Sequence, residues 1–286
     1  MKSIIYCATL ILWPGGVPGL VSEDVYKECF MALATALGVD DSVSQWVGEL
    51  PARSRVFEKN GIDYCCGGKA TLRQACAKRN IDPAAIMTDL LAAGHDPDQR
   101  DWSTATLTDL ADHIESTHHA WLKKELPRVA MRVHRTFTVH GLHYAFLTEL
   151  KTTYDRFASE MDAHMFKEEH ILFPRIRLIE ARQADVDVDH PVAIMEHEHD
   201  RAGADLEQLR TLSDNYTAPA EACNTFRAML DALREIEVDT HIHVHKENNI
   251  LFPRAIAAAR AGGVYIRLVL PAKSPSRPGG RCGIMQ

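Results

Sequence analysis

The sequence lacks the features that several large classes of protein require. Its 286 residues carry a net charge of −7 and no basic run with interleaved aromatic residues, so it has no electrostatic reason to bind nucleic acid. Its seven cysteines are an odd number without regular spacing, which argues against a disulfide framework and favours a reducing cytoplasm. Strand-like alternation of apolar and polar residues is almost absent, so we expect an all-α fold.

The sequence also lacks an apolar run long enough to span a bilayer, so we expect no association with a membrane. Residues 1–20 come nearest, because Lys2 precedes an apolar stretch from Ile4 to Trp13. This arrangement resembles a secretory signal, but no clear A-x-A cleavage site follows it. A start codon assigned too far upstream would give the same appearance. We therefore predict a cytoplasmic protein, and residues 1–20 are the reason to test that prediction.

What the sequence does contain is histidine, concentrated in one region. Fourteen of the fifteen histidines lie between His113 and His245. Within that region the phrase H-x-x-K-E-x-x-I-L-F-P-R occurs twice, over residues 164–175 and again, 79 residues later, over residues 243–254. A repeated phrase of twelve residues is a much more specific signal than either copy alone.

Each copy of the phrase contains a histidine and a glutamate four residues apart. Residues at this spacing share one face of a helix, so each copy directs an imidazole and a carboxylate to the same point. Two such helices that face each other supply a carboxylate-bridged two-metal centre inside a helix bundle. The predicted ligands from the two copies are His164, Glu168, His243 and Glu247.

A further pair of histidines precedes each copy. His118 and His119 precede the first, His197 and His199 precede the second, and positions 119 and 199 are 80 residues apart. Helical phase places His118 nearer the centre of its apolar face than His119, so the ligand in each pair stays open at this point. For any single histidine a packing or capping role is the simpler interpretation, but six residues at duplicated spacing favour metal.

The chemistry of this donor set indicates the class of metal. Four imidazoles and two carboxylates without a thiolate suit iron or manganese and disfavour structural zinc. With two histidines for each metal, coordination positions stay open for O₂, NO or water.

Four long amphipathic segments carry these residues, which makes a four-helix bundle the simplest architecture. They cover residues 106–133, 142–173, 191–212 and 219–252. Pro174 and Pro253 should end or kink the second and fourth helices, because proline removes a backbone donor and clashes with the preceding turn.

The remaining chain divides at polar and glycine-rich stretches. We predict a small helical domain before the bundle, a polar linker, and chain ends that carry no motif. The predicted boundaries are 1–41 for an N-terminal extension, 42–94 for the small domain, 95–105 for the linker, 106–260 for the bundle and 261–286 for a disordered tail.

The small domain contains D-Y-C-C-G-G-K over residues 63–69. Adjacent cysteines rarely pair with each other, because the ring they close is strained. The glycine pair and Lys69 predict exposed thiols with thiolate character, able to transfer iron or sulfur to a partner or to sense oxidation. Burial as small apolar residues is an equally simple account of Cys65 and Cys66, and it is the one we expect for Cys76 and the other cysteines.

Taken together, these motifs resemble the RIC family, the di-iron iron–sulfur cluster repair proteins, which join a small domain carrying D-Y-C-C-G-G-K to a hemerythrin-like bundle. The similarity extends over residues 42–258 and includes E-H-D-x-A-G at 198–203 and E-N-N-I-L-F-P at 247–253. It implies a hemerythrin-like four-helix bundle that holds two iron ions, bridged by carboxylates and an oxo group. The ligands that it implies are His119, His164, Glu168, His199, His243 and Glu247.

The resemblance also implies a role, which is repair of iron–sulfur clusters damaged by nitric oxide or oxidative stress, by donation of iron and without conventional enzymatic turnover. Cys65 and Cys66 would act in thiol transfer or redox steps, with damaged iron–sulfur proteins as partners and NO or O₂ as small ligands. A hemerythrin-like NO or O₂ binder, or an NO reductase, is the alternative. The cysteine domain argues against a pure gas binder but not against a reductase, and a homodimer stays open.

Overall fold

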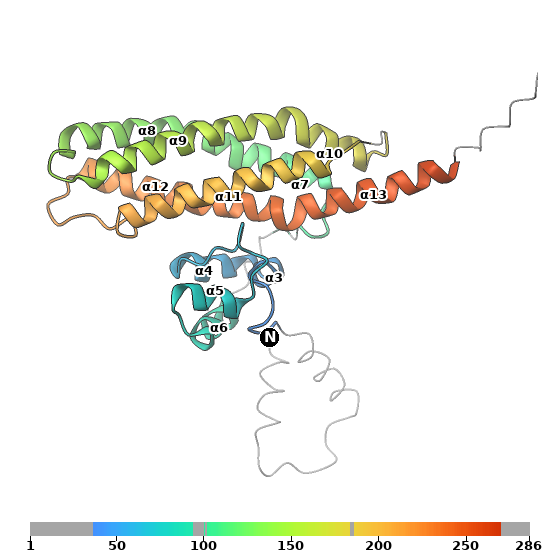
Figure 1. Ribbon diagram of the computed structural model, residues 1–286, viewed down its shortest axis with the longest axis horizontal. Helices are drawn as coiled ribbons and strands as arrows, with labels where there is room; N and C mark the ends of the chain where they lie inside the picture. Colours follow the sequence, from blue (N-terminus) through green and yellow to red (C-terminus); the bar gives the residue numbers. More distant parts are fainter. Residues whose placement is uncertain (1–36, 94–99, 101, 184–185, 270–286) are drawn as a thin grey trace, which may run out of the picture. The chain divides into compact units, whose positions relative to one another are not determined.

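The computed structural model describes residues 37–93, 100, 102–183 and 186–269, the last eight by their backbone alone. The chain divides into two compact units, residues 1–99 and 100–286. In the described ranges every regular element is a helix, and one isolated antiparallel bridge joins Ser42 to Thr71 (Figure 1). The predicted all-α class is therefore confirmed. Our predictions for residues 1–36 and 270–286 concern residues outside these ranges.

The first unit is built from short helices with well-defined starts: α3 (Val43–Glu49), η1 (Pro51–Arg53), α4 (Ser54–Lys59), α5 (Leu72–Arg79) and α6 (Pro83–Ala92). Ser42 and Thr71 each form a capping box, with Gln45 and Gln74, at the starts of α3 and α5. These helices enclose a small core of their own, whose largest buried side chains include Trp46, Phe57, Tyr64 and Leu72.

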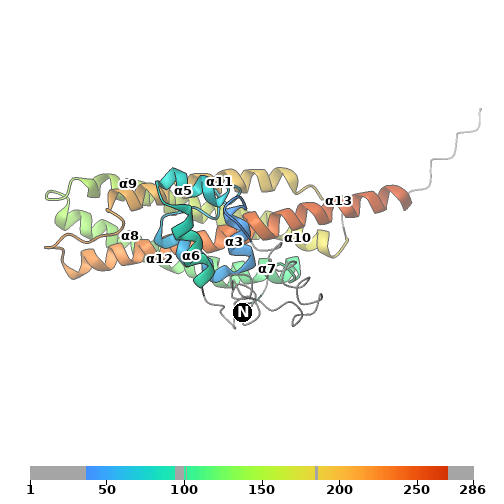
Figure 2. The ribbon, with the colours of Figure 1, turned by 90° about the horizontal axis from the view of Figure 1, so that it is seen from below.

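The second unit is a bundle of four helical rods (Figures 1 and 2). The first joins α7 (Leu107–His113), η2 (Ile114–His119) and α8 (Ala120–His140), and the second joins α9 (Phe146–Lys167), η3 (Glu168–Leu172) and α10 (Phe173–Glu180). The third is α11 (Asp189–Leu212), and the fourth joins α12 (Asn224–Lys246), η4 (Glu247–Leu251) and α13 (Phe252–Val269). The four-helix bundle that we predicted is confirmed.

The bundle has two hydrophobic clusters, one toward each end of the rods. The first cluster includes Leu126, Phe157 and Phe226, and the second includes Leu110 and Phe252. On every rod the predicted metal ligands lie in sequence at the junction between the residues of one cluster and those of the other. The polar layer is therefore enclosed by apolar packing above and below it.

The helices are longer than the sequence pattern indicated. We predicted that Pro174 and Pro253 end or kink their helices, and neither residue ends its helix, because both rods continue through them. Each proline is the second residue of an α-helical segment that follows a π-helical turn, a position that tolerates its missing N–H. The fourth rod reaches Val269, beyond residue 260, where we predicted the bundle to end and a disordered tail to begin.

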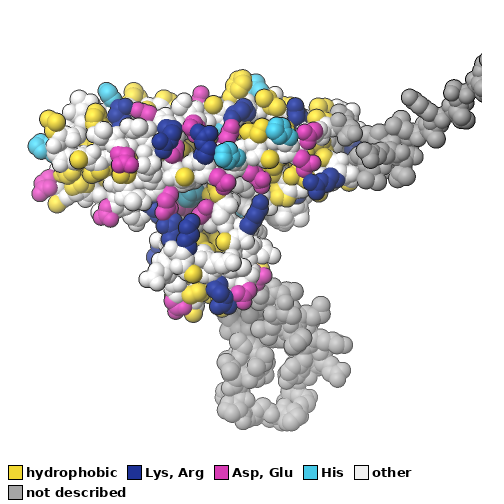
Figure 3. All heavy atoms as spheres, viewed as in Figure 1, with side chains coloured by type: hydrophobic (Ala, Val, Ile, Leu, Met, Phe, Trp, Pro, Cys, Tyr) yellow, Lys and Arg dark blue, Asp and Glu magenta, His cyan; other side chains and the backbone are white. Residues whose placement is uncertain are grey.

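Charged side chains of both signs are interspersed over the face of the bundle shown in Figure 3. Within the described ranges, no helix combines the length and the apolar character needed to cross a membrane. The signal-like residues 1–20 lie outside those ranges.

Candidate metal centre

Three of the four rods change from α-helix to π-helix at the predicted ligands. The turn η2 ends at His119, η3 begins at Glu168 and η4 begins at Glu247. In a π turn each hydrogen bond spans five residues, and such turns are frequent at functional sites. The wider turn shifts the phase of the helix. His118 and His119 are consequently both buried, and α-helical phase alone ranked them wrongly.

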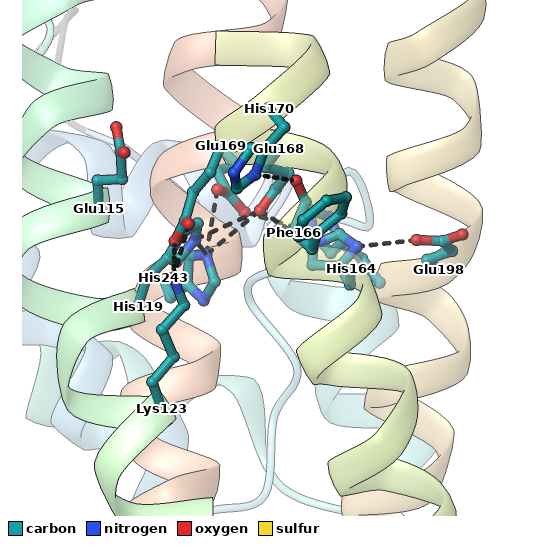
Figure 4. Close-up of polar contacts among 12 residues, drawn as sticks. Glu115, His119, Lys123, His164, Phe166, Glu168, Glu169, His170, Glu198 and His243 are labelled. Atoms are coloured by element: carbon teal, nitrogen blue, oxygen red, sulfur yellow. Dashed lines mark hydrogen bonds and ion pairs between the residues drawn. The ribbon is translucent and has the colours of Figure 1, made fainter.

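The structure brings six predicted residues together inside the bundle; Figure 4 labels His119, His164, Glu168 and His243 among them. Each is at most 2% exposed. They are His119, His164, Glu168, His199, His243 and Glu247. The alternatives in the two histidine pairs lie elsewhere, because His118 bonds Asp239 and His197 is exposed on α11.

The six side chains form two groups of potential ligands that share both glutamates. One group contains His119 and His243, whose Nε2 atoms are 3.0 Å apart. The other contains His164 and His199, whose Nε2 atoms are 2.9 Å apart. The chain therefore offers two positions for a cation, with two imidazoles at each.

Each glutamate reaches one histidine of each group. Glu168 Oε2 is 3.3 Å from Nε2 of His119 and 3.2 Å from Nε2 of His164. Glu247 reaches Nε2 of His243 through Oε1 at 3.1 Å and Nε2 of His199 through Oε2 at 3.3 Å. Both carboxylates thus lie where a bridge between two metal ions would be.

The donor atoms fit a cation better than they fit one another. Glu168 Oε1, Glu168 Oε2 and Glu247 Oε2 are buried and accept no hydrogen bond from any residue that the structure describes. A buried carboxylate without compensation is costly, and a bound cation supplies that compensation. Burial raises the pKa of both glutamates, but the adjacent histidines outweigh it, so that the pKa of Glu168 is about 2 and that of Glu247 is well below its usual range. Both side chains are therefore anionic at neutral pH.

Outer partners hold three of the four imidazoles by their Nδ1 atoms. Nδ1 of His119 donates to Glu169 Oε1 at 2.9 Å, and Nδ1 of His164 donates to Glu198 Oε2 at 3.0 Å. Nδ1 of His199 lies 2.8 Å from Asn248 Oδ1. Such contacts fix the tautomer and direct Nε2 toward a metal.

The fourth imidazole is held differently. Nδ1 of His243 is buried and forms no hydrogen bond with the described part of the chain. Its ring stacks on His118, with 5.7 Å between the ring centroids. His118 in turn lies between Asp239 Oδ1 and Lys246 Nζ, each at 2.8 Å, and Lys246 also donates to His113.

Lysines complete two of the outer contacts. Lys123 Nζ donates to both oxygens of Glu169 at 2.6 Å, and Lys167 pairs with Glu198. We did not predict any of these outer partners from the sequence. A signal was present, however, because Glu169 and Asn248 each directly follow a predicted bridging glutamate in the repeated phrase.

A pocket of about 280 Å³ between α9 and α11 reaches the centre from one side. His164 lines it, together with Glu198 and Lys167. The Arg201–Glu160 ion pair also lies along its wall, as does Asp205, which pairs with Arg156. Of the six clustered residues, His164 is the one that lines this pocket.

The cysteines of the first unit differ from our expectation of exposed thiolates. Cys65 is buried and Cys66 is half-buried. The contact with the Cys66 thiol, burial and the nearby Asp63 raise the pKa of the Cys65 thiol well above its usual range. Cys65 is therefore a protonated thiol at neutral pH.

The other described cysteines divide between burial and exposure. Cys76 is buried, as expected, but Cys223 is exposed at the start of α12, which contradicts our expectation for the remaining cysteines. Its Sγ lies 3.2 Å from His140 Nε2.

Comparison with known proteins identifies both units. Residues 39–94 match ScdA_N, a domain of unknown function (DUF542), and residues 110–255 match the hemerythrin HHE cation binding domain. Relatives named iron-sulfur cluster repair protein YtfE, from Citrobacter koseri, Escherichia coli O157:H7 and Enterobacter sp. (strain 638), are each 36% identical over 218 residues, which is 76% of this chain and 97% of each relative. The bundle is therefore a metal-binding domain, and the chain belongs to the family of iron–sulfur cluster repair proteins that the sequence motifs indicated.

Proposed function

We propose that the bundle binds two iron ions and that the protein repairs damaged iron–sulfur clusters by donating this iron. The observation that carries the proposal is the buried set of four histidines and two glutamates. Each glutamate reaches one histidine of each of the two groups of potential ligands. In the proposed centre His119 and His243 hold one ion, His164 and His199 hold the other, and Glu168 and Glu247 bridge them.

The donor set favours iron or manganese, and the similarity to iron–sulfur cluster repair proteins favours iron. Imidazole and carboxylate without thiolate suit iron and manganese, and the matched segment is a cation binding domain. When bound, the two ions supply open coordination positions and, in the ferrous state, exchangeable iron.

The chain's own residues control how firmly that cargo is held. Ferrous iron binds histidine and carboxylate only moderately compared with thiolate-rich clusters, so its transfer to a damaged cluster is favourable. Glu169 and Glu198 orient His119 and His164, and a pocket lies beside His164. We propose Cys65 and Cys66 as the thiols that act on the client, in thiol transfer or a redox step.

The relatives named for cluster repair support this role, because they match this chain along nearly their whole length. A hemerythrin-like binder of NO or O₂, or an NO reductase, would use the same open positions. The first unit, with its adjacent cysteines, favours repair over a gas binder.

An anaerobic transfer experiment tests the proposal. The ferrous-loaded protein is mixed with a [4Fe–4S] dehydratase that NO has inactivated, and recovered dehydratase activity is measured against iron that stays on the donor. We expect recovery that tracks iron loss and exceeds the recovery given by the same amount of free ferrous iron. The matched control is Glu168→Gln, which we expect to carry less iron and to repair correspondingly less.

Two results would contradict the proposal. Iron that stays on the protein while the dehydratase remains inactive would favour a gas-binding role. Production of N₂O from NO over many turnovers, with an electron donor and without iron loss, would favour the reductase.

A further inference from the structure

The loop between α4 and α5 in the first unit places three potential metal ligands together. Sγ of Cys65 lies 3.7 Å from Sγ of Cys66 and 3.2 Å from Oδ1 of Asp63. Donor atoms of all three residues lie within 4.8 Å of one another. Cys65 is buried, whereas Cys66 and Asp63 are half-buried, so the cluster is open on one side.

The distance between the two sulfur atoms excludes a disulfide and is compatible with a metal site. A disulfide requires about 2.05 Å between sulfur atoms. In a tetrahedral site with metal–sulfur distances of about 2.3 Å, two thiolate ligands lie about 3.8 Å apart. The observed 3.7 Å, at which the two thiols are hydrogen-bonded to each other, is also close to the edge of such a tetrahedron. A carboxylate oxygen and a sulfur in the same site are separated by about 3.6 Å, so Asp63 needs to move outward by only a few tenths of an ångström.

Backbone donors hold the carboxylate beside the two sulfur atoms. Asp63 Oδ1 accepts the N–H groups of Cys65 and Cys66, each at 3.0 Å, and Oδ2 accepts the N–H of Gly67 at 2.9 Å. A Cβ atom at position 67 would lie 3.0 Å from Oδ2 of Asp63, so glycine permits this close approach. The loop therefore presents a fixed carboxylate, although three N–H groups already satisfy it.

We propose that Asp63, Cys65 and Cys66 form a second metal site, which binds one divalent transition-metal ion such as zinc or ferrous iron. Two thiolates and one carboxylate hold the ion, and the fourth tetrahedral position stays open for an external ligand. Binding forms two metal–sulfur bonds and breaks two S–H bonds, and the two protons go to solvent. The site does not depend on the proposed repair function, because it contains none of the bundle ligands.

Cobalt(II) is a direct probe of this site, because only thiolate ligands give a sulfur-to-cobalt charge-transfer band. The full chain, already loaded with iron in the bundle, is titrated anaerobically with Co²⁺. We expect a charge-transfer band that saturates at one equivalent per chain. Cys65→Ser and Cys66→Ser should each remove most of the band, whereas Cys223→Ser, which removes an exposed thiol elsewhere, should leave it unchanged.

Two further variants test the carboxylate. Asp63→Asn retains an oxygen that accepts N–H groups but removes the negative charge, and we expect an affinity for Co²⁺ at least about tenfold lower. Gly67→Ala removes no ligand, but the added methyl group displaces the Asp63 carboxylate, so this variant should also bind Co²⁺ more weakly than wild type. Far-UV circular dichroism of each variant checks that the unit stays helical.

A labelling experiment tests the site even where a variant folds poorly. The wild-type protein is treated with iodoacetamide, with and without Zn²⁺, and the alkylated cysteines are identified by mass spectrometry. We expect Zn²⁺ to protect Cys66 while Cys223 is labelled equally in both samples. A charge-transfer band that survives both cysteine substitutions, or Cys66 labelling that Zn²⁺ does not change, would overturn the proposal.

Discussion

The two halves of the bundle repeat the same inner ligands but surround them differently. His119, His164 and Glu168 of the first half correspond to His199, His243 and Glu247 of the second, and all six are buried. In the first half both histidines donate to carboxylates, Glu169 and Glu198. In the second half His199 meets the amide of Asn248, and Nδ1 of His243 bonds no described residue. The six inner side chains are therefore repeated between the halves, whereas the residues that bond the Nδ1 atoms of the histidines are not.

The difference extends to the lysine of each repeated phrase. Lys167 pairs with the carboxylate of Glu198, whereas Lys246 lies between the imidazoles of His113 and His118. His118 occupies the position, 80 residues earlier, that corresponds to Glu198. At one position for metal, Glu198 bonds His164 and Asn248 bonds His199, and a pocket lies beside His164. At the other position, Glu169 bonds His119, and the ring of His243 stacks on His118.

The largest effect is expected where the halves are equivalent, at the bridging glutamates. Glu168→Gln and Glu247→Gln should each reduce bound iron from two ions per chain to fewer than one, because each carboxylate reaches both groups of histidines. Metal analysis by mass spectrometry measures the ratio. A variant that keeps two tightly bound iron ions would show that its glutamate is no bridge.

The next largest effect on iron affinity is expected at the residues that bond the histidines from outside, where the two halves differ. Glu198→Gln and Glu169→Gln remove the charge that supports His164 and His119, and each should lower iron affinity by about 10- to 100-fold. Asn248→Ala should cost less than about tenfold, because the contact it removes is uncharged. Competition with a ferrous chelator measures all three. Equal losses for Asn248→Ala and Glu198→Gln would mean that charge in the outer contacts does not matter.

A third substitution, with a smaller expected effect on iron binding, makes the second half of the bundle more like the first. Asn248→Asp gives His199 the kind of carboxylate partner that His119 has in Glu169, so iron loss to the chelator should slow by a few-fold. The rate under anaerobic conditions is the measurement, and Asn249→Asp, one residue further along η4, is the matched control for added charge. Faster iron loss from Asn248→Asp than from the control would contradict this interpretation of the supports.

The smallest effect concerns the end of the first half, where Glu180 has no counterpart, since the corresponding residue is Ala259. Glu180 accepts the N–H groups of Leu107 and Thr108 at the start of α7, at 2.7 and 2.8 Å. Because the carboxylate is partly exposed, Glu180→Gln should lower the free energy of unfolding of the metal-free protein by about 1 kcal/mol or less. Urea unfolding at neutral pH measures the change.

The same residue gives a pH dependence whose sign is fixed. Burial raises the pKa of Glu180, but the hydrogen bonds from Thr108 and Leu107 outweigh it, so its pKa in the folded protein lies below the usual value of 4.5. The stability it contributes is present above that value and is lost as the pH falls through the folded pKa. The difference in stability between wild type and Glu180→Gln should therefore shrink as the pH is lowered below about 4.5. A difference that grows toward acid would contradict the assignment.

The repeated phrase was sufficient to predict four of the six clustered residues, because the four-residue spacing fixes a helix face. It was insufficient for His118 and His119, since the π turn from Ile114 to His119 changes the phase and leaves no mark in the sequence. The outer partners depend on tertiary contacts, such as that between Lys123 and Glu169, 46 residues apart. The motif left exposure and burial of Cys65 equally open, because the fold-back of Asp63 onto its own loop is not visible in the sequence.

The central claim is that two metal ions lie between the two pairs of histidines and share both glutamates. The most direct measurement is a crystal structure of the iron-loaded protein with anomalous diffraction at the iron edge. We predict two iron peaks, one at Nε2 of His119 and His243 and one at Nε2 of His164 and His199, both in contact with Glu168 and Glu247. A single peak, or a peak that touches only one of the glutamates, would contradict this account.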